Sequence, residues 1–112
     1  MDPDEFLPLP PAALHIMLAL AGRELHGYAI IQDVLRQSDG RYKLGPGTLY
    51  DNLQRMLEQG LVEEVERPRV AQDPRRRCYR LSRLGKRVVE AEMSRLEGVI
   101  RDTRVRIQTA RA

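Results

Sequence analysis

The sequence contains a single cysteine, Cys78, so no disulfide can form within the chain and no cluster of cysteines can bind zinc. It has no tryptophan, one phenylalanine and four tyrosines, a composition that argues against a large aromatic-lined ligand pocket. No apolar run approaches the ~20 residues that cross a bilayer, and no signal-peptide pattern is present. We therefore expect a cytoplasmic protein without a membrane partner.

Catalytic and metal-binding patterns are also lacking. His15 and His26 are the only histidines, and neither belongs to a set of ligands at metal-site spacing. There is no glycine-rich nucleotide motif, no paired-carboxylate motif and no nucleophile close to a histidine in the sequence. The sequence thus predicts a protein that is not an enzyme and that has no cofactor or metal.

Charge is abundant and unevenly distributed. The net charge is +3, yet residues 67–87 hold nine basic residues and one acidic residue, so this segment carries +8 and the remaining chain −5. The nine are Arg67, Arg69, Arg75, Arg76, Arg77, Arg80, Arg83, Lys86 and Arg87. Such segregation is typical of a surface that binds nucleic acid.

Apolar spacing predicts two short helices in the first part of the chain. The first spans 11–21 and stops at Gly22; the second follows Gly27 and ends at the polar break 38–40. We expect the second helix to bury Tyr28, Ile31, Val34 and Leu35, with Ile30 beside them, and to expose Gln32, Asp33, Arg36 and Gln37.

A third amphipathic helix begins near Pro46 and is capped by Gly60. Its predicted buried stripe consists of Leu49, Leu53, Met56 and Leu57. Small residues at its start, Gly47 and Thr48 among them, allow a close approach to phosphates or base edges, although the same residues also suit an ordinary turn before a capped helix. Asn52 and Arg55 carry groups that can bond adenine and guanine edges.

Residues 61–66 and 78–82 are predicted to pair as strands, joined by a loop that contains Pro68 and Pro74. Arg75, Arg76 and Arg77 lie where this loop enters the second strand. A run of charge is usually a solvated surface, but a basic hairpin directly after a helix-turn-helix is the wing of a winged-helix DNA-binding protein.

The C-terminal segment from Ser82 has no proline and a heptad pattern, which predicts one long helix packed on another helix. The seam consists of Val89, Met93, Leu96, Ile100, Thr103, Ile107 and Ala110. Because the chain offers no free helix of similar length, we expect the partner to be a second copy. Ser82 is the predicted N-cap, and Gly85 and Gly98 are expected to weaken the helix.

Four segments in register resemble the PadR family of transcriptional regulators. They begin at residues 25–30 (Leu-His-Gly-Tyr-Ala-Ile) and 47–50 (Gly-Thr-Leu-Tyr), and continue through 53–62 and 77–85. The resemblance implies a winged helix-turn-helix repressor that dimerises through its C-terminal helix, binds an inverted-repeat operator and responds to small aromatic or cationic compounds. It assigns DNA contacts to Thr48, Tyr50 and, before the helix, Lys43.

Two positions depart from the family pattern. Asp51 and Asn52 follow Tyr50 where the family commonly has proline, and Cys78 stands where an aromatic residue is common. The first departure leaves the operator sequence open, and the second leaves open a thiol-based response at this position.

These observations predict a mostly α protein with a small β-hairpin: an arm (1–10), a winged helix-turn-helix domain (11–82) and a dimerisation helix (83–112). The partners expected are double-stranded DNA, a second copy of the chain and a small-molecule effector. The DNA-binding residues are predicted to be Lys43, Gly47, Thr48, Tyr50, Asn52, Arg55, Arg75, Arg76 and Arg77. The dimer interface is predicted to hold Val89, Met93, Leu96, Ile100, Thr103 and Ile107. The alternative is a winged-helix module that contacts proteins and not DNA. A third hypothesis, a sensor of a ligand or of thiol chemistry at the dimer interface, is compatible with a DNA-binding repressor.

Overall fold

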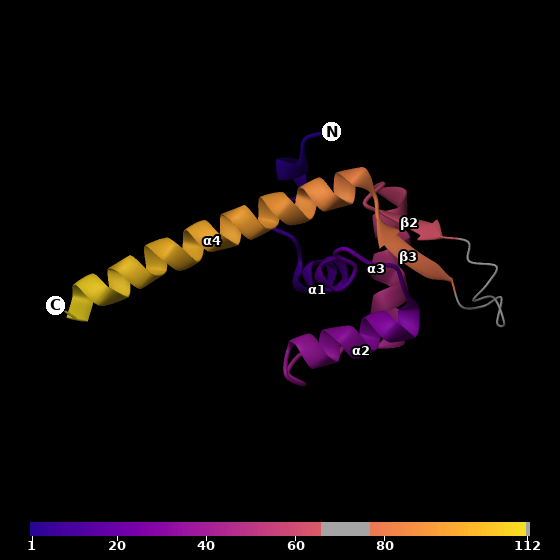
Figure 1. Ribbon diagram of the computed structural model, residues 1–112, viewed down its shortest axis with the longest axis horizontal. Helices are drawn as coiled ribbons and strands as arrows, with labels where there is room; N and C mark the ends of the chain where they lie inside the picture. The colour runs from indigo at the N-terminus through magenta and orange to yellow at the C-terminus, as the bar shows by residue number, and fades with distance from the viewer. Residues whose placement is uncertain (66–76, 112) are drawn as a thin grey trace.

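The computed structural model describes residues 1–65 and 77–111 and shows a small helical domain from which one long helix projects (Figure 1). The helices and strands, in chain order, are η1 (Pro3–Phe6, a 3-10 helix), α1 (Pro11–Ala19), β1 (Leu25–His26), α2 (Gly27–Gln37), α3 (Pro46–Glu58), β2 (Val62–Val65), β3 (Cys78–Leu81) and α4 (Arg83–Arg111). The mostly α architecture with a small antiparallel sheet and a long C-terminal helix is therefore confirmed.

The core lies where α1, α2 and α3 meet. Ile16, Ile30, Val34 and Leu49 are completely buried there, and Leu53 is buried with them. The buried stripe predicted for α3 is confirmed at Leu49, Leu53 and Met56, while Leu57 is half-buried. Three mutually packed helices, of which α1 is apolar around most of its circumference and α2 and α3 have one apolar face each, form the helix-turn-helix core.

The buried face of α2 differs from the prediction. Tyr28 is 63% exposed and Leu35 is also exposed, whereas Asp33, predicted to face solvent, is buried. Arg23 and Arg36 both pair with the Asp33 carboxylate. Burial alone would raise the pKa of this carboxyl, but hydrogen bonds and charge from the two arginines hold the pKa below its ordinary value. The ion pairs compensate the buried charge, and the apolar pattern could not reveal them.

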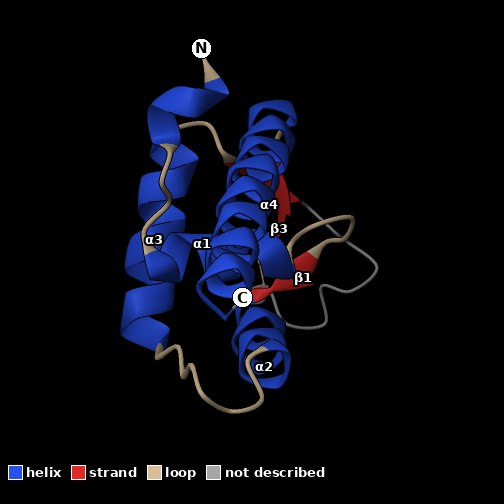
Figure 2. Ribbon diagram, turned by 90° about the vertical axis from the view of Figure 1, so that its left-hand side faces the viewer, coloured by secondary structure: helices blue, strands red, loops and turns tan. Residues whose placement is uncertain are grey.

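The predicted hairpin is present, and a third strand joins it (Figure 2). β3 lies in the centre, antiparallel to β2 on one side and to β1 on the other, with Val62 opposite Leu81 and His26 opposite Cys78. β1 is only two residues long, too short for an alternating pattern, and was not predicted from the sequence.

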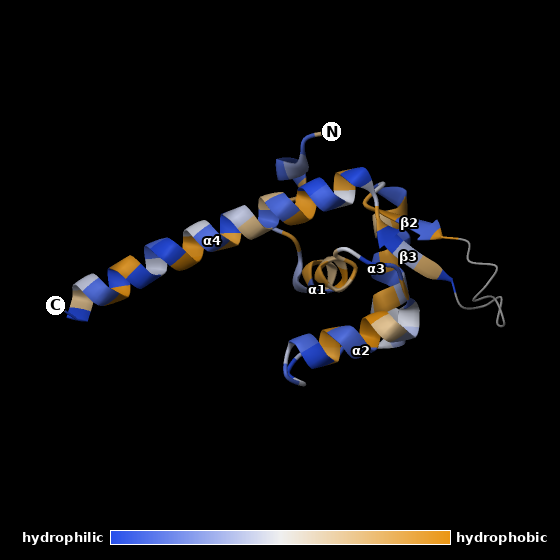
Figure 3. Cartoon of the chain, in the orientation of Figure 1, coloured by the Kyte–Doolittle hydropathy of each residue, from blue (hydrophilic) through white to orange (hydrophobic). Residues whose placement is uncertain are grey.

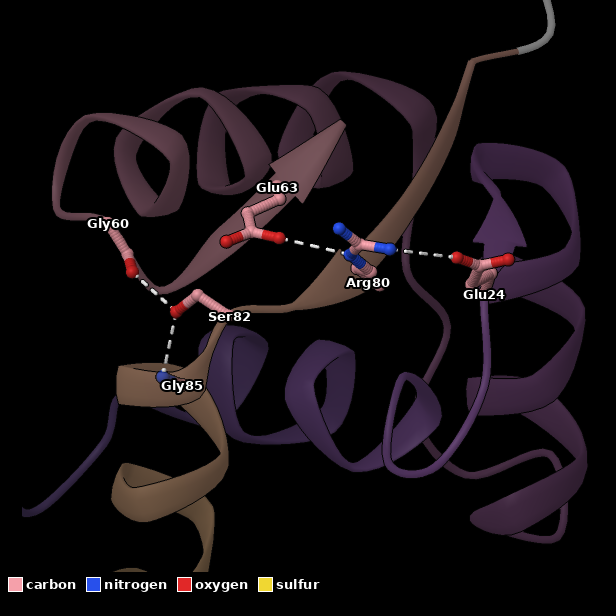
Figure 4. Close-up of polar contacts among 6 residues, drawn as sticks. All are labelled: Glu24, Gly60, Glu63, Arg80, Ser82 and Gly85. Atoms are coloured by element: carbon pink, nitrogen blue, oxygen red, sulfur yellow. Dashed lines mark hydrogen bonds and ion pairs between the residues drawn. The ribbon is translucent and has the colours of Figure 1, made fainter. Parts of the chain in front are cut away.

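The junction between α3, β2 and α4 is closely packed (Figure 4). Gly60 has φ +76° and ends α3, and the Leu61 N–H donates back to the Met56 carbonyl at 2.9 Å. The Ser82 hydroxyl accepts from the Gly85 N–H at 2.9 Å, which confirms Ser82 as the N-cap of α4, and it donates to the Gly60 carbonyl. A Cβ at Gly85 would overlap the Leu61 carbonyl oxygen, so glycine is required there by close packing.

The N-terminal arm packs against α4. η1 lies beside the first half of α4 (Figure 1), and the Leu9 N–H donates to the Glu92 carboxylate at 2.8 Å. Farther along, every side chain from Val99 to Arg111 is exposed, and apolar segments recur along the projecting helix between hydrophilic ones (Figure 3). Within the described part of the chain, none of the helices combines the length and apolar character needed to cross a membrane.

Candidate nucleic-acid interface

The start of α3 presents an open surface. Gly45 is the N-cap, Pro46 occupies the first turn, and Gly47 and Thr48 are exposed. A Cβ at Gly47 would meet no atom within 4 Å, so packing inside the protein does not require glycine at this position. Small residues at an exposed helix N-terminus leave room for a partner to approach the positive end of the helix dipole.

Other predicted contact residues lie on one flank of α3 or in the loop before it. The Asn52 side-chain amide donates to the Thr48 carbonyl of its own helix at 2.8 Å and is half-buried. Asn52 and Arg55 border a small cavity of about 80 Å³ that is also lined by Phe6 and Leu9 of the N-terminal arm. Lys43 is exposed in the loop between α2 and α3.

The opposite flank of α3 borders a larger pocket, of about 360 Å³, which we call the tyrosine pocket. The residues that define it here are Gly27, Tyr28, Tyr50, Glu64, Arg77 and Tyr79. Three of the four tyrosines are thus gathered from α2, α3 and β3, although the sequence argued against an aromatic-lined pocket. Even a small number of aromatic residues can line a pocket when the fold brings most of them together.

Tyr50 lies against the start of α2. A Cβ at Gly27 would overlap the Tyr50 hydroxyl, so a bare backbone at Gly27 allows the tyrosine ring to lie there. Tyr50 nevertheless remains 51% exposed. Residues 25–30 and 47–50 are two of the segments that resemble the family, and they meet in space where Tyr50 contacts Gly27.

The described arginines of the hairpin are paired with glutamates. Arg77 lies 3.3 Å from a carboxylate oxygen of Glu64, and Arg80 bridges Glu63 at 3.0 Å and Glu24 at 3.4 Å (Figure 4). The positive charge of segment 67–87 is therefore partly balanced across the sheet, which its sequence alone did not indicate. Arg75 and Arg76, predicted to contact DNA, lie outside the described residues.

Tyr79 forms the buried wall of the tyrosine pocket. Its side chain is 5% exposed, and no described residue forms a hydrogen bond with its hydroxyl. Burial, together with the charge of Glu64, raises the pKa of Tyr79, a group that is already protonated at physiological pH without this shift, so the hydroxyl can donate a hydrogen bond.

The histidines and the cysteine have local structural surroundings. His26 caps α2 by accepting a hydrogen bond from the Ala29 N–H at 3.2 Å, and His15 stacks on Tyr42 with ring centroids 4.3 Å apart. Cys78 is buried with a free thiol. The described residues include no group of three or more His, Cys, Asp or Glu side chains arranged to hold a metal ion.

The heptad seam of α4 is divided between the core and the surface. Val89 is buried within the chain's own core, and Leu96 is half-buried. Met93, Ile100 and Ile107 are each between 47% and 49% exposed, and Thr103 is also exposed. The free apolar part of the seam therefore begins at Met93.

The family model described as the transcriptional regulator PadR-like family matches residues 16–91. A transcriptional regulator of Mycobacterium tuberculosis, Rv3488, is 34% identical over 89 residues, which cover 80% of this chain and 78% of that protein. A PadR family transcription regulator from Clostridium difficile R20291 has a similar fold, with a TM-score of 0.71 at 20% identity, covering 88% of this chain and 99% of the other. The crystal structure of Bacillus subtilis PadR in complex with operator DNA matches at a TM-score of 0.61 and 17% identity, over 77% of this chain and 48% of that one.

Proposed function

The chain belongs to the transcriptional regulator PadR-like family, and on that premise we propose that it is a dimeric repressor that binds an inverted-repeat operator in double-stranded DNA. Members of this family are transcriptional regulators and not enzymes, in agreement with the lack of catalytic motifs in the sequence. Binding to chromosomal DNA would require the cytoplasmic location expected from the sequence.

The observation that carries the proposal is the open N-terminal surface of α3 beside the base of the hairpin. Gly47 and Thr48 are exposed there, and Arg55 is exposed two turns later on the same helix. In a winged-helix protein this helix enters the major groove, and the hairpin contacts the backbone next to it. Bacillus subtilis PadR, which has a similar fold, is in complex with operator DNA, and this supports DNA binding by this chain.

The exposed apolar side chains of α4 support dimerisation. Met93, Ile100 and Ile107 recur at heptad spacing on a helix whose last 13 described residues, Val99 to Arg111, are all exposed. Pairing two such helices would bury these side chains in a symmetric interface. A two-fold dimer presents two α3 helices to two half-sites, which is why we propose an inverted repeat.

Repression and its release follow from this arrangement. A dimer bound at an operator would exclude other proteins from the same DNA. A small molecule could bind between the winged-helix domain and α4, or could change the pairing of the two α4 helices. Either event would alter the spacing of the two α3 helices and release the DNA.

One observation favours a second candidate, a winged-helix module that contacts proteins. Arg77 and Arg80 are already paired with glutamates, so the described part of the hairpin attracts phosphates less than its sequence suggests. A protein-docking hairpin does not need free arginines.

The test is fluorescence anisotropy on DNA from upstream of the gene and on scrambled DNA, at several salt concentrations. We expect tight binding that is selective for the upstream DNA and weakens steeply with salt. Failure to bind any duplex at low salt would favour the protein-contact module. Whether the protein represses or activates is then measured with a reporter gene whose promoter contains the bound DNA.

A further inference from the structure

The tyrosine pocket lies between the two elements that would hold DNA. One wall is the flank of α3 that carries Tyr50, and the other is the base of the hairpin, with Glu64 and Arg77. The start of α2, with Gly27 and Tyr28, closes the pocket at one end. In the docking expected of a winged helix, a nucleic-acid strand between the groove read by α3 and the hairpin would pass close to this opening.

The polar groups of the pocket are mainly donors. Tyr28 and Tyr50 are 63% and 51% exposed, so both hydroxyls are free to turn toward a ligand at the rim. Arg77 adds a guanidinium group, which binds the oxygens of phosphate in a bidentate manner. Among the described residues that line the pocket, Glu64 alone is acidic, and it lies 3.3 Å from Arg77.

The Tyr79 hydroxyl adds a further donor to this pocket. Tyr79 as a residue is only 5% exposed, but its hydroxyl oxygen is not among the described side-chain polar atoms that are fully buried without a partner, so it is accessible from the pocket. Tyr79 borders the pocket, and none of the described residues satisfies its hydroxyl. A ligand oxygen in the pocket could accept a hydrogen bond from this hydroxyl in place of water.

We propose that the tyrosine pocket seats one phosphate group of the operator backbone, held by the hydroxyls of Tyr28, Tyr50 and Tyr79 and by the guanidinium of Arg77. This inference rests on the proposed function, since it assumes that the chain binds DNA. The phosphate displaces Glu64 from Arg77, and Glu64 therefore opposes binding. The contact positions α3 in the groove without reading sequence.

The first test replaces each pocket tyrosine by phenylalanine and uses Tyr42→Phe as the control, because Tyr42 stacks on His15 and does not line the pocket. Each pocket variant should bind the operator about tenfold more weakly, as expected for one hydrogen bond to a charged group. Tyr79→Phe is the sharpest of the three, since no described residue forms a hydrogen bond with this hydroxyl and its removal should not destabilise the fold. Unchanged affinity in all three would overturn the inference.

The second test uses a variant that should bind the operator more tightly. Glu64→Gln removes the carboxylate that competes for Arg77, so this variant should bind the operator more tightly than the natural protein. Glu63→Gln, on the same strand but paired with Arg80, is the matched control and should leave affinity close to its starting value. Weaker binding by Glu64→Gln would contradict a phosphate in this pocket.

The third test locates the phosphate. Single phosphates of the operator are replaced by neutral methylphosphonates, and anisotropy is measured with the natural protein and with Tyr79→Phe. At one position in each half-site, the two changes should together cost less than the sum of their separate effects. Additive effects at every position would overturn the inference while leaving DNA binding intact. Absence of binding by the natural protein would overturn the proposed function itself.

Discussion

The Glu92 carboxylate, in the middle of α4, accepts a hydrogen bond from the Leu9 backbone N–H at 2.8 Å, although the two residues are 83 positions apart. Arg95 donates to the other carboxylate oxygen from the solvent side. Glu92 is 1% exposed, so the N-terminal arm and the C-terminal helix are joined by a buried charge that has a partner for each oxygen. This contact predicts how the protein responds to acid.

Stability should decrease as acid protonates Glu92. The hydrogen bond from Arg95 lowers the pKa of this carboxyl, against the effect of burial, and the Leu9 N–H lowers it further. Because the pKa is lower in the folded than in the unfolded state, the contribution is complete above the unfolded value of about 4.3 and is lost as pH falls through the folded value. Asp33 acts in the same direction.

Chemical denaturation between pH 7 and pH 3 measures this effect. Glu92→Gln should lower the free energy of unfolding at pH 7 by about 1–3 kcal/mol. The neutral amide would replace the charged carboxylate that accepts the hydrogen bonds from Leu9 and Arg95. The variant should then lose less stability on acidification than the natural protein. Parallel curves for the two proteins would show that Glu92 does not contribute to the pH dependence.

Gly85 and Gly98, both in α4, should respond to alanine in opposite directions. Gly85→Ala places a methyl group on the Leu61 carbonyl oxygen, and the helix start must move away from β2. We expect a loss of about 1–3 kcal/mol or more, the usual size for such overlap in a packed core. Gly98→Ala meets open space and should stabilise the helix by about 1 kcal/mol. Thermal unfolding of both variants measures these two changes in stability. A Gly85→Ala protein as stable as the natural one would contradict the close packing of Gly85 on Leu61.

Ile100→Asp should separate the dimer. Ile100 is 49% exposed on the heptad seam, and a charge there would be buried on pairing. Val105→Asp is the matched control, because Val105 is equally apolar and 56% exposed but lies off the seam. Sedimentation velocity should show a monomer for Ile100→Asp and a dimer for Val105→Asp. A dimeric Ile100→Asp protein would exclude this seam as the interface.

Alanine at Arg75, Arg76 and Arg77 should weaken binding to every DNA sequence. If each arginine contacts one phosphate, the slope of log affinity against log salt should flatten by up to ~3 units. Alanine at Arg101, Arg104 and Arg106 removes the same charge from the exposed end of α4 and should change the slope little. An unchanged slope in the first variant would exclude these arginines from the interface.

Local patterns in the sequence were sufficient for the main elements. Leu49, Leu53 and Met56 recur at helical spacing, and Gly60 follows them, so the position and buried face of α3 could be predicted. Ser82 precedes a long run of helix formers and does cap α4. These features depend on neighbours within a few residues, where periodicity and capping preferences act directly.

Contacts between distant segments were decided by the tertiary structure. Asp33 is buried because Arg23, ten positions earlier, reaches its carboxylate, and Gly85 is needed because Leu61 lies against it. The tyrosine pocket exists because the fold brings Tyr28, Tyr50 and Tyr79 together from three elements. The sequence by itself determined the main helices, the hairpin strands and the family, through spacing, local hydrogen bonding and short motifs. Only packing decided which charges are buried and paired and which tyrosines line one pocket, because these depend on how separate elements meet in space.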